Sequence, residues 1–129
     1  MSEIDWELIE DKLENVKDAL TTIEERFSQV PNADFFRTKT GREKSDGICM
    51  LFIAIGESLK QIDELSNRTF LSRYPKVDWK KIIGFRNIVA HNYFNIDEDV
   101  LFNNCSTHLS PLLETVNRMI NELEKNHAS

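Results

Sequence analysis

Glycine and proline are scarce in this sequence, with four glycines and three prolines among 129 residues. Both residue types are needed at the tight turns of β-hairpins, so their scarcity argues against an all-β protein. Hydrophobic residues instead recur at steps of three and four over long segments, which is the periodicity of amphipathic helices. The length suits one domain. We therefore expect a single all-α domain over residues 1–129, an up-and-down bundle of four to five helices.

Cysteine and long hydrophobic runs are also rare. The two cysteines, Cys49 and Cys105, lack metal-site spacing and lie among hydrophobic residues, so we expect buried thiols in a reducing compartment. The longest hydrophobic run, residues 48–56, has nine residues, whereas a membrane-spanning helix needs about twenty. The first residues are acidic, where a secretory signal would be basic. These absences favour a cytoplasmic protein with no membrane partner.

Charge is unevenly distributed along the chain, whose net charge is −6. Residues 1–30 carry nine acidic and three basic side chains, whereas residues 68–86 carry six basic side chains and one acidic one. Such a basic stretch can attract phosphate locally, while the acidic remainder discourages indiscriminate binding of nucleic acid. An ordinary solvated helix face is the alternative interpretation of the same stretch.

The periodicity predicts helices over residues 3–27, 41–65 and 97–125, and another that begins at Trp79. Asp78 is expected to cap that helix, which should fray at residues 91–93 because asparagines follow. We expect residues 28–40 and 66–77 to be connectors with short helical turns, and Pro111 to kink or interrupt the last helix. Gly56 costs its helix about 1 kcal/mol relative to alanine, and a close helix crossing would explain its presence.

Residues 86–93 read Arg-Asn-Ile-Val-Ala-His-Asn-Tyr and contain a permanent cation, an imidazole and a phenol. A guanidinium can bind phosphate oxygens, and an imidazole can transfer protons near neutral pH, so the motif suits phosphodiester chemistry. On an ideal helix, however, Arg86 and His91 are about 140° apart. They share a site only if the helix ends there or a partner chain completes it.

The motif and its flanks, Ile-Ile-Gly-Phe-Arg-Asn-Ile-Val-Ala-His-Asn-Tyr-Phe at 82–94, resemble HepT-type toxins of the HEPN superfamily. Ile-Gly-Glu-Ser-Leu-Lys at 55–60, Arg-Tyr-Pro at 73–75 and Trp-Lys-Lys-Ile-Ile at 79–83 are similar to the same family, in the same order. The resemblance implies a HEPN-like bundle that acts as an endoribonuclease toxin, with a composite site across a homodimer. It also implies a nucleotidyltransferase antitoxin that transfers AMP to the motif tyrosine, as in type VII-like toxin–antitoxin systems.

The candidate site residues follow from the chemistry and the resemblance together. Arg86 and His91 are the expected catalytic residues, and we expect RNA cleavage to need no metal or other cofactor. Asn87 is expected to orient the His91 ring or contact phosphate, and Glu57 to form a salt bridge with an arginine of the motif helix. By resemblance, Tyr93 is the AMP acceptor, and its modification would place negative charge and bulk beside Arg86.

Other interpretations stay open at this point. The same bundle could be a noncatalytic subunit whose basic stretch and motif bind nucleotide or hold a nucleotidyltransferase, or an adaptor in which Arg86 and His91 are structural. Tyr93 could be a packing residue at a helix end. His108 and His127 are weaker catalytic candidates because each stands alone, and the acidic residues 97–99 are expected to cap a helix rather than bind a divalent ion.

Overall fold

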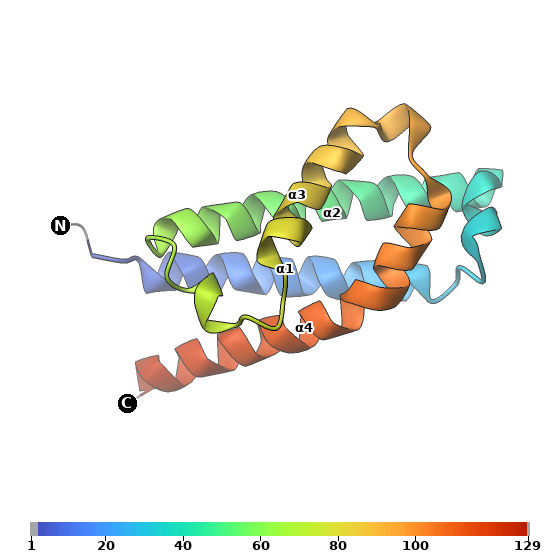
Figure 1. The fold of residues 1–129 in the computed structure, drawn as a ribbon. Coiled ribbons are helices and arrows are strands. Elements are labelled where there is room, and N and C mark those ends of the chain that lie inside the picture. Colours follow the sequence, from blue (N-terminus) through green and yellow to red (C-terminus); the bar gives the residue numbers. More distant parts are fainter. Residues whose placement is uncertain (1–2, 129) are drawn as a thin grey trace.

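The computed structural model describes residues 3–128, and Figure 1 shows that they form a bundle of helices. The α-helices are α1 (Trp6–Phe27), α2 (Lys39–Leu65), α3 (Trp79–His91) and α4 (Glu98–Ala128). Short 3-10 helices join them: η1 (Ala33–Arg37), η2 (Leu71–Arg73) and η3 (Tyr93–Asn95). The described residues contain no strand. The expectation of an all-α, HEPN-like bundle is confirmed.

Side-chain caps set the first residue of each helix. The helix expected from residue 3 begins at Trp6, because the Asp5 carboxylate accepts a hydrogen bond from the Leu8 N–H at 3.0 Å. The helix expected from residue 41 begins earlier, at Lys39, because the Thr38 hydroxyl accepts from the Gly41 N–H. Asp78 caps α3 as expected, since its carboxylate accepts from the Lys81 N–H at 3.1 Å.

The last helix is longer than expected, because α4 continues to Ala128 rather than ending near residue 125. It runs through Pro111 without interruption. Figure 1 shows α4 changing direction between its orange first part and its red second part. A kink is what proline produces inside a helix, since its ring removes one backbone hydrogen bond and crowds the preceding turn.

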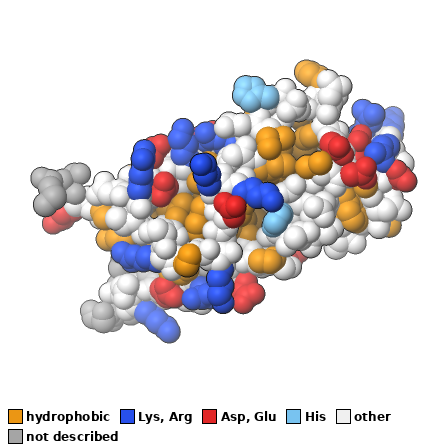
Figure 2. All heavy atoms as spheres, viewed as in Figure 1, with side chains coloured by type: hydrophobic (Ala, Val, Ile, Leu, Met, Phe, Trp, Pro, Cys, Tyr) orange, Lys and Arg blue, Asp and Glu red, His pale blue; other side chains and the backbone are white. Residues whose placement is uncertain are grey.

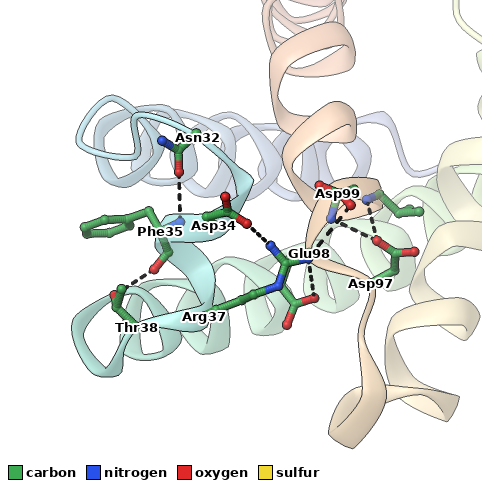
Figure 3. Close-up of polar contacts among 9 residues, drawn as sticks. Asn32, Asp34, Phe35, Arg37, Thr38, Asp97, Glu98 and Asp99 are labelled. Atoms are coloured by element: carbon green, nitrogen blue, oxygen red, sulfur yellow. Dashed lines mark hydrogen bonds and ion pairs between the residues drawn. The ribbon is translucent and has the colours of Figure 1, made fainter.

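Polar contacts join the start of α4 to η1 (Figure 3). The Asp97 carboxylate accepts from the Asp99 N–H at 2.9 Å, so this part of the acidic trio caps α4 as expected. The Arg37 guanidinium forms an ion pair with Asp34 and lies 3.6 Å from a carboxylate oxygen of Glu98. These contacts fix the position of the segment that connects α3 to α4, which carries Tyr93.

The hydrophobic core lies between α1, α2 and α4, with α3 crossing α2 from outside (Figure 1). The face of α1 that enters it is fully buried and follows the predicted spacing: Ile9, Leu13, Val16, Leu20 and Ile23. Cys49 and Cys105 are buried free thiols, as expected. Burial raises the pKa of each to about 12, so both are protonated at neutral pH. Among the described residues, no helix is long and apolar enough to cross a membrane.

Candidate functional site

The candidate site begins at the crossing of α2 and α3, where Gly56 faces Arg86. A Cβ at position 56 would lie 2.8 Å from the Cβ of Arg86, closer than two such carbons approach in real structures. Only glycine therefore allows the two helices to lie this close. The close helix crossing expected at Gly56 is confirmed, and it places the motif arginine against the middle of α2.

Arg86 is held in this position by Glu57, the next residue of α2. Arg86 Nη1 lies 2.7 Å from Glu57 Oε1, and the arginine side chain is 12% exposed while that of glutamate is 53% exposed. The salt bridge that we expected from Glu57 is present. Within the described part of the chain, no hydrogen bond occupies Arg86 Nη2. The guanidinium thus keeps free donors for a phosphate group.

Asn87 and His91 follow Arg86 on α3. Asn87 was expected to orient the His91 ring or contact phosphate; its Oδ1 accepts from Arg86 Nε at 3.4 Å, and contact with phosphate stays a prediction. His91 is the last residue of α3, and its side chain is exposed. The helix ends at His91, as expected, although His91 itself is still helical. Arg86 faces α2, and His91 projects about 140° away around the helix.

Tyr93 lies beyond the helix end, in η3, with its side chain 43% exposed. Hydrogen bonding and charge of the nearby Asp46 carboxylate of α2 raise the pKa of Tyr93 above its usual value. Tyr93 lines a hollow of about 530 Å³ together with Arg42, Asp46 and Phe94.

Tyr93 does not lie beside Arg86 within one protomer. Glu57, which holds Arg86, and Asp46, which lines the same hollow as Tyr93, are eleven residues apart on α2. At the rise of an α-helix, this separation is about 16 Å along the axis. Tyr93 begins η3 and shares its hollow with residues near the start of α2, so the placement of AMP beside Arg86 stays a prediction.

The basic stretch is divided between two faces. Arg68, Lys80 and Arg86 line a hollow of about 480 Å³ at the α2–α3 crossing, together with Lys60 of α2. Figure 2 shows Lys and Arg side chains gathered over the second half of α2 and the first turns of α3. Lys76 and Lys81 instead line another hollow, of about 210 Å³, with His108, and Arg73 stacks over the Trp6 ring at 5.5 Å.

Sequence reasoning missed two residues at these sites. Lys60 follows Gly56 and Glu57 by one helical turn, so its spacing could have placed it on the same face of α2. Asp46 had no such signal, because it lies 47 residues before Tyr93 in the sequence. Among the described residues, no group of three or more His, Cys, Asp or Glu side chains is arranged to hold a metal ion. The side chain of His127 lies outside those that the structure describes.

A helical bundle with a fixed arginine and an exposed histidine on its crossing helix agrees with the expected HEPN class. The family model described as Ribonuclease HepT-like matches residues 9–119. Because this match covers most of the sequence, the chain belongs to the HepT-like ribonuclease family.

Two proteins of Methanocaldococcus jannaschii with provisional RNase names are similar to this chain. MJ1380 is 39% identical over 56 residues, which are 41% of this chain and 51% of that protein. MJ0127 is 25% identical over 114 residues, which are 88% of this chain and 85% of that protein. The match to MJ1380 therefore spans about half of that relative's length. No solved structure matches this chain.

Proposed function

We propose that this protein is a HEPN ribonuclease toxin that forms one domain over residues 1–129 and cleaves cytoplasmic RNA without a metal ion. The observation that carries the proposal is the salt bridge in which Glu57 holds the Arg86 guanidinium at 2.7 Å. It occurs in a chain that belongs to a family of ribonucleases. RNA cleavage needs a base that removes the proton of the ribose 2′-hydroxyl and an acid that protonates the departing 5′-oxygen. It also needs positive charge on the phosphorane. His91 supplies the proton transfers, and Arg86 supplies the charge.

A homodimer completes this site. Arg86 faces α2 while His91 is exposed at the end of α3, so one chain does not direct both toward a single phosphate. A two-fold axis beside α3 would bring two arginines and two histidines to one cleft. One imidazole then acts as the base and the other as the acid. The single His91 of a lone chain could not serve as both at the same time.

A partner nucleotidyltransferase neutralises the toxin in a type VII-like toxin–antitoxin system by transferring AMP to Tyr93. The Tyr93 oxygen attacks the α-phosphorus of ATP, pyrophosphate leaves, and the phenol loses its proton. The half-exposed ring and the adjoining hollow support this assignment, since an enzyme must reach the hydroxyl and the nucleotide needs space. Each transfer adds about 329 Da, and Tyr93→Phe should abolish the addition.

A noncatalytic role is the second candidate, and the separation of Arg86 from His91 within one chain favours it. Under this alternative, the bundle binds nucleotide or acts as an adaptor for a nucleotidyltransferase, and it cleaves nothing itself. Measurement of RNA cleavage separates the two functions.

The deciding experiment compares purified parent protein, His91→Ala and His108→Ala on single-stranded RNA in the presence of EDTA. His91→Ala should lower the rate about 100-fold to 10,000-fold, the usual cost of losing an acid or base. His108→Ala, which lines a different hollow, should cleave at the parent rate. Equal cleavage by parent and His91→Ala would refute the catalytic assignment, and cleavage abolished by EDTA would refute metal independence.

A further inference from the structure

The hollow at the α2–α3 crossing has the size and lining of a nucleotide-binding site. Its volume is about 480 Å³, within the range of ligand pockets in proteins. Arg86 is one of its lining residues, so the hollow adjoins the proposed cleavage site. We infer that this hollow binds single-stranded RNA next to the scissile phosphate, with Lys60, Arg68 and Lys80 as phosphate ligands. The inference rests on the proposed ribonuclease function and names the binding site for its substrate.

Positive charges converge on this hollow from three separate segments. Lys60 belongs to α2, Arg68 to the connector that follows, and Lys80 to the first turn of α3. Within the described residues, none of the three forms an ion pair, although Asp63 also lines the hollow. The lining therefore carries more positive than negative charge, and a bound polyanion would relieve the repulsion between the cations.

The backbone at Arg68 is unusual for an arginine. Asn67 and Arg68 both have positive φ angles, 54° and 61°, a region that asparagine tolerates but that residues with longer side chains rarely adopt. The Arg68 N–H donates to the Asp63 carbonyl at 2.7 Å and so holds this turn in place. The turn places Arg68 at the hollow, at a position where glycine would have been the unstrained choice for the backbone.

An apolar wall completes the hollow and favours a nucleotide over a bare anion. Leu71, Trp79 and Ile83 line it beside the cations. The Trp79 ring is held in place because its Nε1 donates to the Tyr74 carbonyl at 3.0 Å. Sites for single-stranded nucleic acid combine such a wall, which contacts base or ribose, with cations that bind the backbone.

The test measures the binding of a fluorescent single-stranded RNA to protein carrying His91→Ala, so that the RNA stays intact. Lys60→Ala, Arg68→Ala and Lys80→Ala are added one at a time and together, with Lys39→Ala as the matched control at the opposite end of α2. We expect each hollow variant to weaken binding and to reduce the slope of log affinity against log salt by about 0.7. Lys39→Ala should change neither quantity.

The same measurement separates failure of this inference from failure of the proposed function. Parent-like affinity and salt slope in the triple variant, with its helical circular dichroism spectrum intact, would overturn the RNA site. So would loss of affinity for a nucleotidyltransferase partner with RNA binding unchanged, since the hollow would then be a protein-docking surface. If the triple variant loses RNA affinity but the parent protein cleaves no RNA, the result supports the hollow as an RNA site and refutes the ribonuclease function.

Discussion

Arg86 lies directly against Gly56, and a Cβ added to that glycine would come within 2.8 Å of the arginine Cβ. The next residue of α2, Glu57, accepts the charge-assisted hydrogen bond that fixes the guanidinium. Two consecutive residues of α2 therefore position the motif arginine: Gly56 allows its backbone to approach α2, and Glu57 orients its guanidinium. The packing of two helices and the position of the proposed phosphate ligand are thus one structural feature.

Gly56→Ala should destabilise the fold and slow RNA cleavage, because the added methyl group pushes α3 away from α2. Overpacking of this kind costs about 1–3 kcal/mol, which exceeds the gain of about 1 kcal/mol from replacing glycine in a helix. Gly84→Ala is the matched control, since a Cβ there meets nothing within 4 Å and should stabilise the protein. Urea unfolding measures both effects. Equal stability of the two variants would show that the crossing has room for a side chain.

Glu57→Gln should lower the cleavage rate far more than it lowers stability. Loss of the carboxylate charge loosens Arg86, but an ion pair whose glutamate is 53% exposed contributes only about 0.2–1 kcal/mol to folding. Cleavage kinetics and urea unfolding of Glu57→Gln, each compared with the parent protein, measure the two effects. A cleavage rate equal to that of the parent protein would mean that Arg86 does not depend on Glu57 for its position.

Asp46→Asn should lower the pKa of Tyr93 toward 10, the value of a free phenol. In the parent protein, the Asp46 carboxylate accepts the phenol hydrogen bond and favours the protonated ring, so ionisation needs a higher pH. Absorbance of tyrosinate over an alkaline titration reports the shift. The other tyrosine, Tyr74, also has a raised pKa, because of burial and Glu122. Tyr93→Phe therefore serves to identify which part of the titration curve belongs to Tyr93. A titration curve unchanged by Asp46→Asn would contradict the hydrogen bond.

Arg68→Gly should stabilise the protein by about 1 kcal/mol, because glycine adopts a positive φ without the crowding that a Cβ introduces. The same change removes a cation from the hollow and should weaken RNA binding. Arg68→Lys keeps the charge and the strain, so it should retain most of the binding without the gain in stability. Thermal unfolding measures the stability of both Arg68 variants, and RNA titration measures their affinity for RNA. A glycine variant that is less stable than the parent would show that the arginine side chain stabilises the fold.

Ile88→Glu should convert the proposed homodimer to monomer and reduce cleavage at the same time. Ile88 is 54% exposed and lies one turn before His91 on the outer face of α3, which a two-fold partner would cover. Leu8→Glu, at an exposed position of α1, is the control and should remain dimeric. Light scattering at micromolar concentration distinguishes the two states. A dimer that tolerates Ile88→Glu would place its interface on another face.

Several features of the structure could be predicted from local sequence. Asp78 before a hydrophobic repeat predicted the start of α3, and Gly56 inside a helix predicted a close crossing. Glu57 in a hydrophobic stretch predicted an ion pair with the motif. Each signal is local because capping and helix periodicity depend on residues only a few positions apart. The exact helix ends were less predictable, since Thr38 and Asp5 each moved a start by a few residues.

The sequence by itself determined the helical class, the family motif and the residue types that could perform phosphodiester chemistry. Only the tertiary structure decided which of them meet. It placed Arg86 with Glu57 and Tyr93 with Asp46, left His91 exposed, and divided the basic stretch between two hollows. The physical reason is that helical spacing sets directions within one helix, whereas contacts between distant segments depend on how the helices cross and how their connectors turn.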